Sequence, residues 1–385
     1  MSNIVLIEQE IPHYRIGVFN ALSDALDGRL LVCSPKNDDS KFFLTSENEC
    51  IRFGRSEIKA GTAFGGRLFV SNLFDVFKTS RRPDVVILRH VVRNPYIIPF
   101  LLYCRFLGLP TVVWGQGFSR KRSFRPFLNV FDSINLVIVK LSNSYVGYSD
   151  AVVQQLARFE KPGKLFVARN TLNLKTLDGI MKRLQDEGKA SVRERLGLVK
   201  NNYIIFVGRL QKRKRVNFLI NAFQEVNNKN SDTGLLIVGD GPERRELEAL
   251  AGKFETQDVS FLGALDFRES SPYMFSADVM AIPGWLGLAV NHGFYFGLPV
   301  VTCDETVFNE GHPPEIEWLK HKVNGFISSA NSTEQFADDL IWVMRNREKL
   351  GAAARRYYEE QLSIDAMIEG FLKAIKRSKN KLCNP

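Results

Sequence analysis

The residues with the clearest chemical potential form a basic turn at 208–216. The turn follows an apolar run at 203–207 that predicts a strand, and it precedes a helical pattern at 216–226. Five cations fall within seven positions, from Arg209 to Arg215. Cations at the amino end of a helix, where backbone N–H groups are free, are typical of an anion site. A solvated charged turn is the alternative, since most charge runs are exposed. The strand-to-helix position favours phosphate binding.

Two glycine-containing turns follow this basic turn along the chain. Gly239 and Gly241 come directly after an apolar run at 235–238, but their spacing is not the full dinucleotide-binding fingerprint, so they indicate a tight turn more than chemistry. The segment 282–299 has glycines ahead of a predicted helix that carries Asn291 and His292. Because the carboxyl ends of parallel strands share one sheet edge, we expect these turns to lie close together.

These segments together resemble the family 4 retaining glycosyltransferases, which have the glycosyltransferase B fold. The resemblance covers nearly all of the carboxyl-terminal half, whereas the amino-terminal half resembles the family only in outline. The residues that carry it are, in chain order, Val207-Gly208-Arg209-Leu210, Lys214, Phe218-Leu219-Ile220-Asn221-Ala222-Phe223, Leu236-Ile237-Val238-Gly239-Asp240-Gly241-Pro242, Val259-Ser260-Phe261-Leu262-Gly263, Ala277-Asp278-Val279 and Gly297-Leu298-Pro299-Val300-Val301.

The resemblance implies that Arg209 and Lys214 bind the diphosphate of a nucleotide sugar. Fixed cations there stabilise the charge that develops on the departing diphosphate. Further donor contacts that the resemblance implies are Gly208, Gly263, Leu265, Gly287, Leu288, Ala289, Asn291, His292 and Glu315. No D-x-D motif stands near the site, so we expect no metal and no other cofactor. The nucleotide-diphosphate sugar is then a donor substrate.

The sequence departs from the family pattern in the third segment. The family usually has two glutamates eight positions apart, and these positions are Gly284 and His292 here. His292 could bond a ribose hydroxyl, neutralise phosphate as a cation, or simply pack in its helix. The alternative source of a carboxylate is Glu315 or Glu317 in the next loop.

Two residues of the amino-terminal half are predicted catalytic contacts. Gln116 stands where the family often has a histidine, so it could touch the donor sugar but could not act as a general base. His13 follows the first predicted strand and is either an acceptor contact, a base or a structural residue. A glutamine at 116 and the absence of an obvious carboxylate fit a retaining, substrate-assisted transfer better than an inverting one, as the family resemblance implies.

The elements that must position these residues alternate between strand and helix. This pattern predicts an α/β fold of two doubly wound, Rossmann-like domains facing across a cleft. A chain of 385 residues is also too long for one ordinary core. We expect an acceptor-binding domain at 1–170, joined by the terminal helix at 362–385, and a nucleotide-sugar donor-binding domain at 171–361.

The charge indicates an anionic partner, because 52 Lys and Arg against 42 Asp and Glu leave a formal charge of +10. Besides the basic turn, the stretches 67–82 and 119–127 combine cations with phenylalanine. They favour an anionic membrane surface, with a solvated face as the alternative. We expect no nucleic-acid partner, because neither an RNP-like strand nor a helix-turn-helix pattern is present.

The cysteines, the first ten residues and the longest apolar stretch indicate where in the cell the protein acts. Five scattered cysteines lack metal or C-x-x-C spacing, which indicates thiols in a reducing cytosol. The first ten residues lack a basic region of the signal-peptide type, and Arg105 interrupts the apolar stretch 96–109. These features predict a cytoplasmic protein, peripheral at the inner face of the plasma membrane.

The combined expectation is a glycosyltransferase that acts on a lipid-linked or growing surface glycan of the lipopolysaccharide, O-antigen or capsule type, retaining and metal-independent. Two alternatives remain. One is a nucleotide-sugar epimerase on the same fold, although the missing glutamate pair argues against it. The other is a non-catalytic protein that binds sugar nucleotides or membranes.

Overall fold

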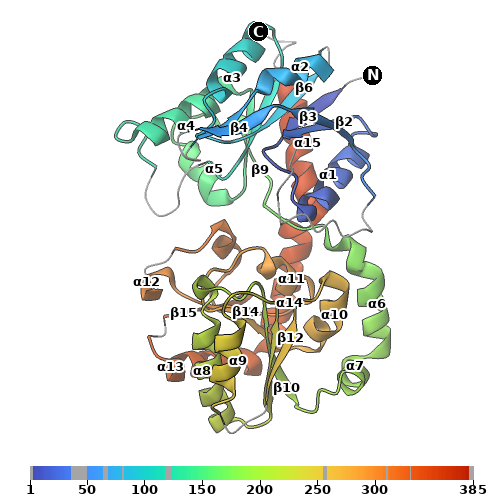
Figure 1. The fold of residues 1–385 in the computed structure, drawn as a ribbon, viewed down its shortest axis with the longest axis vertical. Helices are drawn as coiled ribbons and strands as arrows, with labels where there is room; N and C mark the ends of the chain where they lie inside the picture. The colour runs from blue at the N-terminus through green and yellow to red at the C-terminus, as the bar shows by residue number, and fades with distance from the viewer. Residues whose placement is uncertain are drawn as a thin grey trace. The chain divides into compact units, whose positions relative to one another are not determined.

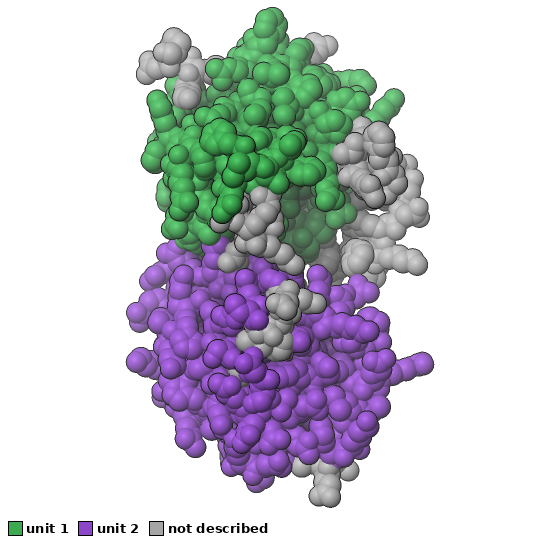
Figure 2. Space-filling model, turned by 90° about the vertical axis from the view of Figure 1, so that its left-hand side faces the viewer, with its two compact units in different colours: residues 1–173, 364–385 green, residues 174–363 purple. Residues whose placement is uncertain are grey.

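The computed structural model describes residues 3–35, 50–63, 68–79, 82–117, 124–254, 258–308, 311–329 and 331–380. Figure 1 shows the fold, and Figure 2 colours its two compact units. Unit 1 comprises 1–173 and 364–385, and unit 2 comprises 174–363. The sequence prediction placed these boundaries at 170/171 and 361/362. The last helix therefore returns to the unit in which the chain begins.

Unit 1 is built on a parallel sheet with the order β3-β2-β1-β6-β7-β8-β9. The order reverses direction at β1, which is the mark of a doubly wound sheet. A separate antiparallel pair joins β4 to β5. The strands are β1 (Ile4–Ile7), β2 (Leu30–Pro35), β3 (Gly54–Ile58), β4 (Ala60–Ala63), β5 (Leu68–Ser71), β6 (Val85–Arg89), β7 (Thr111–Gly115), β8 (Ser144–Gly147) and β9 (Leu165–Val167).

Helices cover both faces of this sheet. β1 shows why, since its side chains alternate between the faces: Ile4 and Leu6 pack in a core with α1 and α15, whereas Val5 and Ile7 pack in a core with α3, α4 and α5. The helices are α1 (His13–Ala25), α2 (Val76–Thr79), α3 (Ile97–Phe106), α4 (Val130–Leu141), α5 (Asp150–Leu156) and α15 (Ile364–Asn380).

Unit 2 repeats the plan with a parallel sheet of order β12-β11-β10-β13-β14-β15. Its strands are β10 (Asn202–Val207), β11 (Thr233–Val238), β12 (Val259–Gly263), β13 (Val279–Ala281), β14 (Val300–Cys303) and β15 (Gly325–Ser328). Its helices are α6 (Asp178–Glu187), α7 (Lys189–Arg195), α8 (Val216–Lys229), α9 (Arg244–Ala251), α10 (Phe267–Ser276), α11 (Ala289–Tyr295), α12 (Glu305–Phe308), α13 (Thr333–Arg345) and α14 (Arg347–Tyr357).

The predicted fold class is confirmed. Within the polar stretch 182–195, Gly188, with φ of 82°, separates α6 from α7. The elements β3, α4 and α14 were not predicted from the sequence. β3 is a sheet edge with mostly exposed or half-buried residues, so it carries no apolar run to find.

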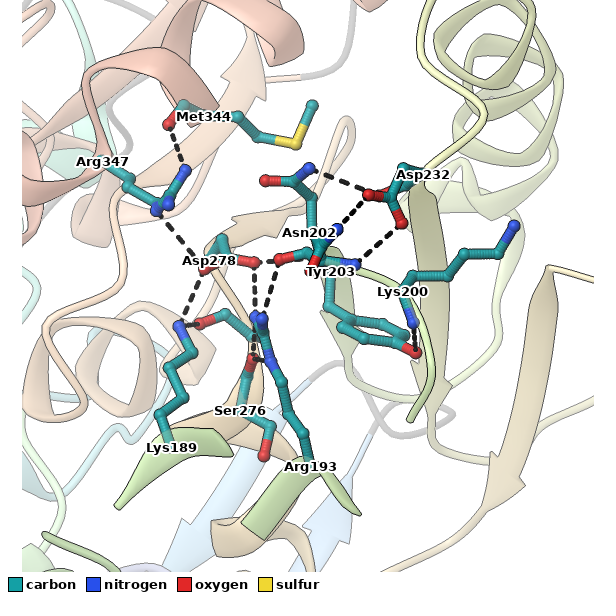
Figure 3. A network of polar contacts seen from close by, with 12 residues as sticks. Lys189, Arg193, Lys200, Asn202, Tyr203, Asp232, Ser276, Asp278, Met344 and Arg347 are labelled. Atoms are coloured by element: carbon teal, nitrogen blue, oxygen red, sulfur yellow. Dashed lines mark hydrogen bonds and ion pairs between the residues drawn. The ribbon is translucent and has the colours of Figure 1, made fainter. Parts of the chain in front are cut away.

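The buried carboxylate of Asp278 connects several elements at the amino edge of the unit 2 sheet (Figure 3). Asp278, which directly precedes β13, accepts hydrogen bonds from the backbone N–H of Tyr203 at 2.8 Å, Lys189 Nζ at 2.8 Å and Arg193 Nη2 at 2.7 Å. Arg347 Nε lies 3.5 Å from it. The carboxylate thus ties α7 and the start of α14 to the strands. This family-motif residue is structural, because it lies at the edge opposite the predicted site.

Among the helices of the described residues, none combines the length and the apolar character needed to cross a bilayer. Three cysteines of the described chain, Cys33, Cys104 and Cys303, are buried free thiols, and Cys50 is an exposed one. Burial raises the pKa of both Cys104 and Cys303 to about 12. These thiols therefore pack as small apolar groups.

Candidate functional site

The candidate site lies at the carboxyl edge of the unit 2 sheet, where the strand order reverses. β10 and β13 are neighbours there, while the next strands, β11 and β14, lie on opposite sides of them. Ligands of doubly wound sheets bind outside the carboxyl ends of the strands at this reversal. The basic turn after β10 and the loop 282–288 after β13 therefore lie where a ligand is expected to bind.

Hydrogen bonds join the basic turn to the loop 282–288. The N–H of Gly284 donates to the carbonyl of Lys214 at 3.2 Å, and the N–H of Trp285 donates to the carbonyl of Arg213 at 2.8 Å. The guanidinium of Arg213 also lies 5.2 Å from the centre of the Trp285 indole. The two segments are thus one rigid assembly, although seventy positions separate them in the sequence.

Lys214 is the most unusual cation of this assembly. Its side chain is buried, and Nζ donates to the carbonyls of Trp285 at 2.6 Å and Leu286 at 2.8 Å. Desolvation, and to a smaller extent the charge of Arg213, lowers its pKa to about 8. An ammonium has three hydrogens, and only two of those on Lys214 are used within the described residues. The third is available for an anion.

Two glycines leave the backbone open around this ammonium. A Cβ added at Gly208 would lie 3.7 Å from Lys214 Nζ, and one added at Gly287 would lie 3.8 Å from it. Both residues have positive φ values, 152° and 69°. Arg209, which follows Gly208, has an exposed side chain. The basic turn therefore carries one exposed cation, Arg209, and one buried cation, Lys214.

The missing family glutamate at position 284 has a steric explanation. A Cβ at Gly284 would overlap the carbonyl oxygen of Arg213, so no side chain fits in this backbone arrangement. The same reasoning applies at Gly239, where a Cβ would overlap the carbonyl of Gly208. These glycines allow loops after neighbouring strands to touch, which agrees with the architectural role predicted for Gly239 and Gly241.

His292 lies in α11 and is 8% exposed. Its ring centre is 4.4 Å from that of Phe267, and its Nε2 is buried without a hydrogen-bond partner among the described residues. Desolvation lowers its pKa to about 4. The ring is therefore neutral at pH 7, which contradicts the predicted alternative that His292 neutralises phosphate as a cation.

The other predicted donor contacts lie on the same sheet edge or near it. Gly263 ends β12 and accepts a 2.7 Å hydrogen bond from the N–H of Gly239, and Leu265 is half-buried just beyond. Leu288 and Ala289 form the start of α11, and Asn291 is fully buried within it. Glu315 is 5% exposed, and its charge acts to raise the pKa of Lys214. Glu315 is thus electrostatically coupled to the basic turn.

In unit 1, the predicted catalytic residues occupy the corresponding edge. Gln116 follows β7 and is exposed between Gly115 and Gly117. A Cβ at Gly117 would lie 2.9 Å from Tyr145 Oη, so the turn packs closely on that side chain. His13 is the first residue of α1, but its side chain is outside the described part of the structure.

The sequence analysis missed a charged aromatic cluster at this edge. Arg15 donates to Tyr148 Oη at 3.1 Å and lies 5.0 Å from the Trp114 ring centre. Arg89 lies 5.1 Å from the same ring, and 3.7 Å from the buried carboxylate of Glu8. The signal was present, since Glu8 directly follows β1 and Arg89 ends β6, the two strands at which the sheet order reverses.

His90 lies beside this cluster and was also missed. Its Nδ1 is 3.0 Å from Tyr145 Oη. Desolvation, then the positive charge of Arg89, lowers its pKa to about 4. Among the described residues of both units, no group of three His, Cys, Asp or Glu side chains is arranged to hold a metal ion.

Residues 189–360 match the protein family described as Glycosyl transferases group 1. The matched segment lies within unit 2 and includes the basic turn and the loop after β13. The resemblance predicted from the sequence is confirmed for this segment. The match supports a family 4-like glycosyltransferase segment at 189–360.

Two curated relatives have the same character. An uncharacterized glycosyltransferase of Haemophilus influenzae is 30% identical over 160 residues, which are 40% of this chain and 43% of that protein. A GDP-mannose-dependent alpha-(1-6)-phosphatidylinositol monomannoside mannosyltransferase of Mycobacterium tuberculosis is 26% identical over 193 residues, 46% of this chain and 48% of that protein. The matches thus span less than half the length of either relative.

The fold of the whole chain is similar to that of Alr3699/HepE from Anabaena, whose crystal structure contains UDP. The TM-score is 0.69 at 16% sequence identity, and the alignment covers 97% of this chain and 99% of that chain. At this identity the likeness concerns the fold. It confirms the predicted glycosyltransferase B fold with two Rossmann-like domains.

Proposed function

We propose that the protein transfers a glycosyl group from a nucleoside diphosphate sugar to a hydroxyl of a lipid-linked or growing surface glycan. The observation that carries the proposal is the ammonium of Lys214, which is buried at the sheet reversal with one hydrogen unused in the described structure. The structural relative that contains UDP supports a nucleotide donor.

In this proposal the acceptor hydroxyl oxygen bonds to the anomeric carbon while the bond from that carbon to the β-phosphate oxygen breaks. Negative charge develops on the departing diphosphate, which takes up the hydroxyl proton. Lys214 and Arg209 stabilise that charge, and the amides at the start of α11 add partial positive charge. Lys214 is held by two carbonyls, so it needs little reorganisation when the charge develops. Arg209 is exposed and adds a planar fork for phosphate oxygens.

Neutral and acidic groups complete the proposed donor site. We assign a ribose hydroxyl contact to the neutral ring of His292. Glu315 is proposed to supply the carboxylate that Gly284 lacks, because its charge already acts on Lys214. Retention of configuration and metal independence remain predictions. Unchanged transfer in the presence of EDTA is the expected result for the second.

The acceptor class is proposed from chemistry and from relatives. The mycobacterial relative is named for a phosphatidylinositol mannoside, which is a lipid acceptor. Two cations, Arg15 and Arg89, lie around Trp114 at the carboxyl edge of the unit 1 sheet, and Arg89 is 3.7 Å from the carboxylate of Glu8. We propose that this cluster faces an anionic group of the acceptor.

The test is donor binding followed by transfer. UDP, UDP-glucose and GDP-mannose are added to the full chain, and a bound donor should raise its melting temperature by mass action. Arg209→Ala should abolish this shift and lower transfer by about 10²-fold or more. The matched control is Lys349→Ala, which removes an exposed cation of the same unit away from the turn. Equal donor binding by the two variants would refute the assignment.

The missing glutamates favour a second candidate, a non-catalytic sugar-nucleotide-binding protein. Both candidates predict a thermal shift with a nucleotide, but only the transferase releases nucleoside diphosphate when a nucleotide sugar and an acceptor are present. The acceptors are supplied as a crude lipid extract. If the protein binds the nucleotide sugar but releases no nucleoside diphosphate in the presence of this extract, the second candidate is favoured.

A further inference from the structure

Unit 1 has a large exposed apolar surface on α3, on the segment before α4, and on α4 itself. We call it the α3–α4 surface, and its main side chains are Leu102, Phe106, Phe127, Leu128, Val130 and Phe131. Phe106 is 85% exposed, Phe127 83% and Leu128 81%. Single exposed apolar residues are common in soluble proteins, but a cluster of this kind marks an interaction site.

α3 shows that this exposure is not a by-product of folding. Ile97, Phe100, Leu101 and Cys104 form its buried side, in the core of unit 1. Its outer side carries the exposed Leu102 and Phe106 beside the exposed Arg105. Large apolar side chains on the outer side of a helix whose other side already fills the core favour a partner there.

The second helix extends the same surface. α3 and α4 lie side by side in Figure 1 and contact each other. Both contribute to the core on one face of the unit 1 sheet, where α4 supplies Leu136, Ile138 and Val139. Their outer sides, with Phe106 from α3 and Phe131 from α4, therefore point away from the same sheet face. The exposed residues of the two helices belong to one surface.

The chain segment that carries this surface has exposed charge of one sign. Between positions 90 and 149 the sequence has a single acidic residue, Asp132, which is 0% exposed and accepts a 3.0 Å hydrogen bond from the N–H of Arg125. The described cations of this range, Arg93, Arg105, Arg125 and Lys140, are all exposed. Exposed cations without exposed carboxylates complement an anionic partner.

The two basic stretches predicted from the sequence differ in this respect. In the stretch 119–127, the described residues include Arg125 and Phe127, which are exposed, whereas 119–123 lie outside the described residues. In the stretch 67–82, the ring centres of Phe74 and Phe77 lie 5.4 Å and 5.6 Å from that of Tyr103. These two aromatic side chains thus support α3 from within unit 1. Among the described residues of the two stretches, those of 119–127 contribute exposed side chains to the α3–α4 surface.

We infer that the α3–α4 surface docks on an anionic lipid bilayer. The aromatic and aliphatic side chains enter the boundary between headgroups and acyl chains, and the four cations bind lipid phosphates. Each signal alone gives weak attachment, but apolar insertion and charge together give stable attachment. The inference rests on the proposed function only for the presence of a lipid-linked acceptor, because the exposure and charge stand without it.

The experiment is cosedimentation of the full chain with vesicles of phosphatidylcholine, with or without phosphatidylglycerol. The wild type should bind the anionic vesicles. The double variant Phe106→Ser/Leu128→Ser keeps the charge and should partition about tenfold or more weakly, since two large side chains no longer leave water. The matched control, Val199→Ser/Val323→Ser, removes two exposed apolar side chains of unit 2 and should bind as the wild type does.

A third variant separates charge from insertion. Arg105→Gln/Arg125→Gln should lose the preference for anionic vesicles and lower the salt sensitivity of binding. Equal vesicle binding by the wild type and the Ser variant at 106 and 128 would overturn the inference. Dimers that form without lipid and disappear in that variant would also overturn it, in favour of a second copy as partner.

The readouts keep this inference distinct from the proposed function. All substituted side chains are exposed, so the variants should keep the wild-type melting temperature and the thermal shift with UDP. Loss of vesicle binding with an intact UDP shift supports docking whatever the reaction is. Vesicle binding without any nucleotide shift would leave the docking surface standing and refute the transferase.

Discussion

The two edges of the unit 2 sheet both hold a desolvated lysine, and they use it differently. At the amino edge, Lys189 donates to the carboxylate of Asp278, which Arg193 also contacts. At the carboxyl edge, Lys214 donates only to backbone carbonyls within the described residues. Desolvation lowers the pKa of both amines, but a bonded carboxylate opposes it only at Lys189.

This difference separates a structural cation from a functional one. The charge of Lys189 is compensated inside the protein, so the amino edge is complete without a ligand. The charge of Lys214 has carbonyl dipoles and the more remote Glu315 as compensation, so an anion would improve its environment. Each of the following predictions tests this contrast.

The largest effect is expected for Asp278→Asn, which leaves Lys189, Arg193 and Arg347 around a neutral amide. The unfolding free energy should fall by about 3–5 kcal/mol, because a buried charge network loses its only carboxylate. Urea denaturation measures this loss. The control is Asp338→Asn, which breaks the exposed pair with Lys229 and should cost about 0–1 kcal/mol. Similar losses in both variants would show that the network is not structural.

The second prediction compares the replacement of each lysine by methionine. Lys214→Met should lower the rate of transfer by about 10²–10³-fold while the protein remains as stable as the wild type, because the substitution removes a desolvated charge. Lys189→Met should do the opposite, with lower stability and nearly normal UDP binding. Transfer rates and urea midpoints of both variants are compared. If both variants lose transfer activity, or both lose stability, the two lysines do not differ in role.

The third prediction concerns the contact that excludes a side chain at position 284. Gly284→Ala should destabilise the protein by about 1–3 kcal/mol and weaken UDP binding, because its Cβ displaces the carbonyl of Arg213 and with it the basic turn. Gly179→Ala in α6 is the control, since a Cβ there meets nothing within 4 Å. It should stabilise the protein by about 0.5–1 kcal/mol. Normal UDP binding by Gly284→Ala would separate this contact from the site.

The smallest effect is a pH dependence of UDP binding. Because the pKa of Lys214 is about 8, its ammonium is lost as the pH rises through that value. UDP affinity should therefore fall above pH 8, by at most about tenfold per pH unit, and calorimetry at pH 7, 8 and 9 measures it. Lys214→Arg keeps its charge and should show no such fall. A fall that persists in Lys214→Arg would assign the titration to another group.

The same pKa gives a stability test with the opposite sign. Lysine in the unfolded chain titrates near about 10.4, so between pH 8 and that value the unfolded state binds the extra proton. The unfolding free energy of the wild type should therefore rise with pH in this window, and the rise should be smaller in Lys214→Met. No difference between the two proteins would mean that Lys214 is not desolvated.

Much of the fold followed from local pattern. The apolar strands and the amphipathic helices of unit 2, including β10, β11 and α8, were predictable because their periodicity is carried by the sequence itself. Short or polar elements were not. α4 was omitted although its apolar face is clear in the structure. Gly188 ends α6 within a polar stretch whose charge pattern is helical on both sides of it.

The candidate site divides in the same way. Arg209 and Lys214 were predicted because a basic turn follows a strand there and because the family resemblance implies a diphosphate contact at these two positions. The neutrality of His292 was not predictable, since burial by Phe267 and its neighbours lowers its pKa. The Arg15–Arg89 cluster was missed although Arg89 ends a strand at the sheet reversal, because its members come from different elements and meet around Trp114 and Tyr148.

The sequence by itself thus determined the alternation of strands and helices, the excess of positive charge, and the residue types available for binding a diphosphate. Only the tertiary structure decided what each charge meets. Lys189 and Lys214 are the same residue type, and they differ because one lies beside Asp278 and the other beside two carbonyls. Burial and partners set the free energy of a charge, and both arise from segments that are distant in the chain.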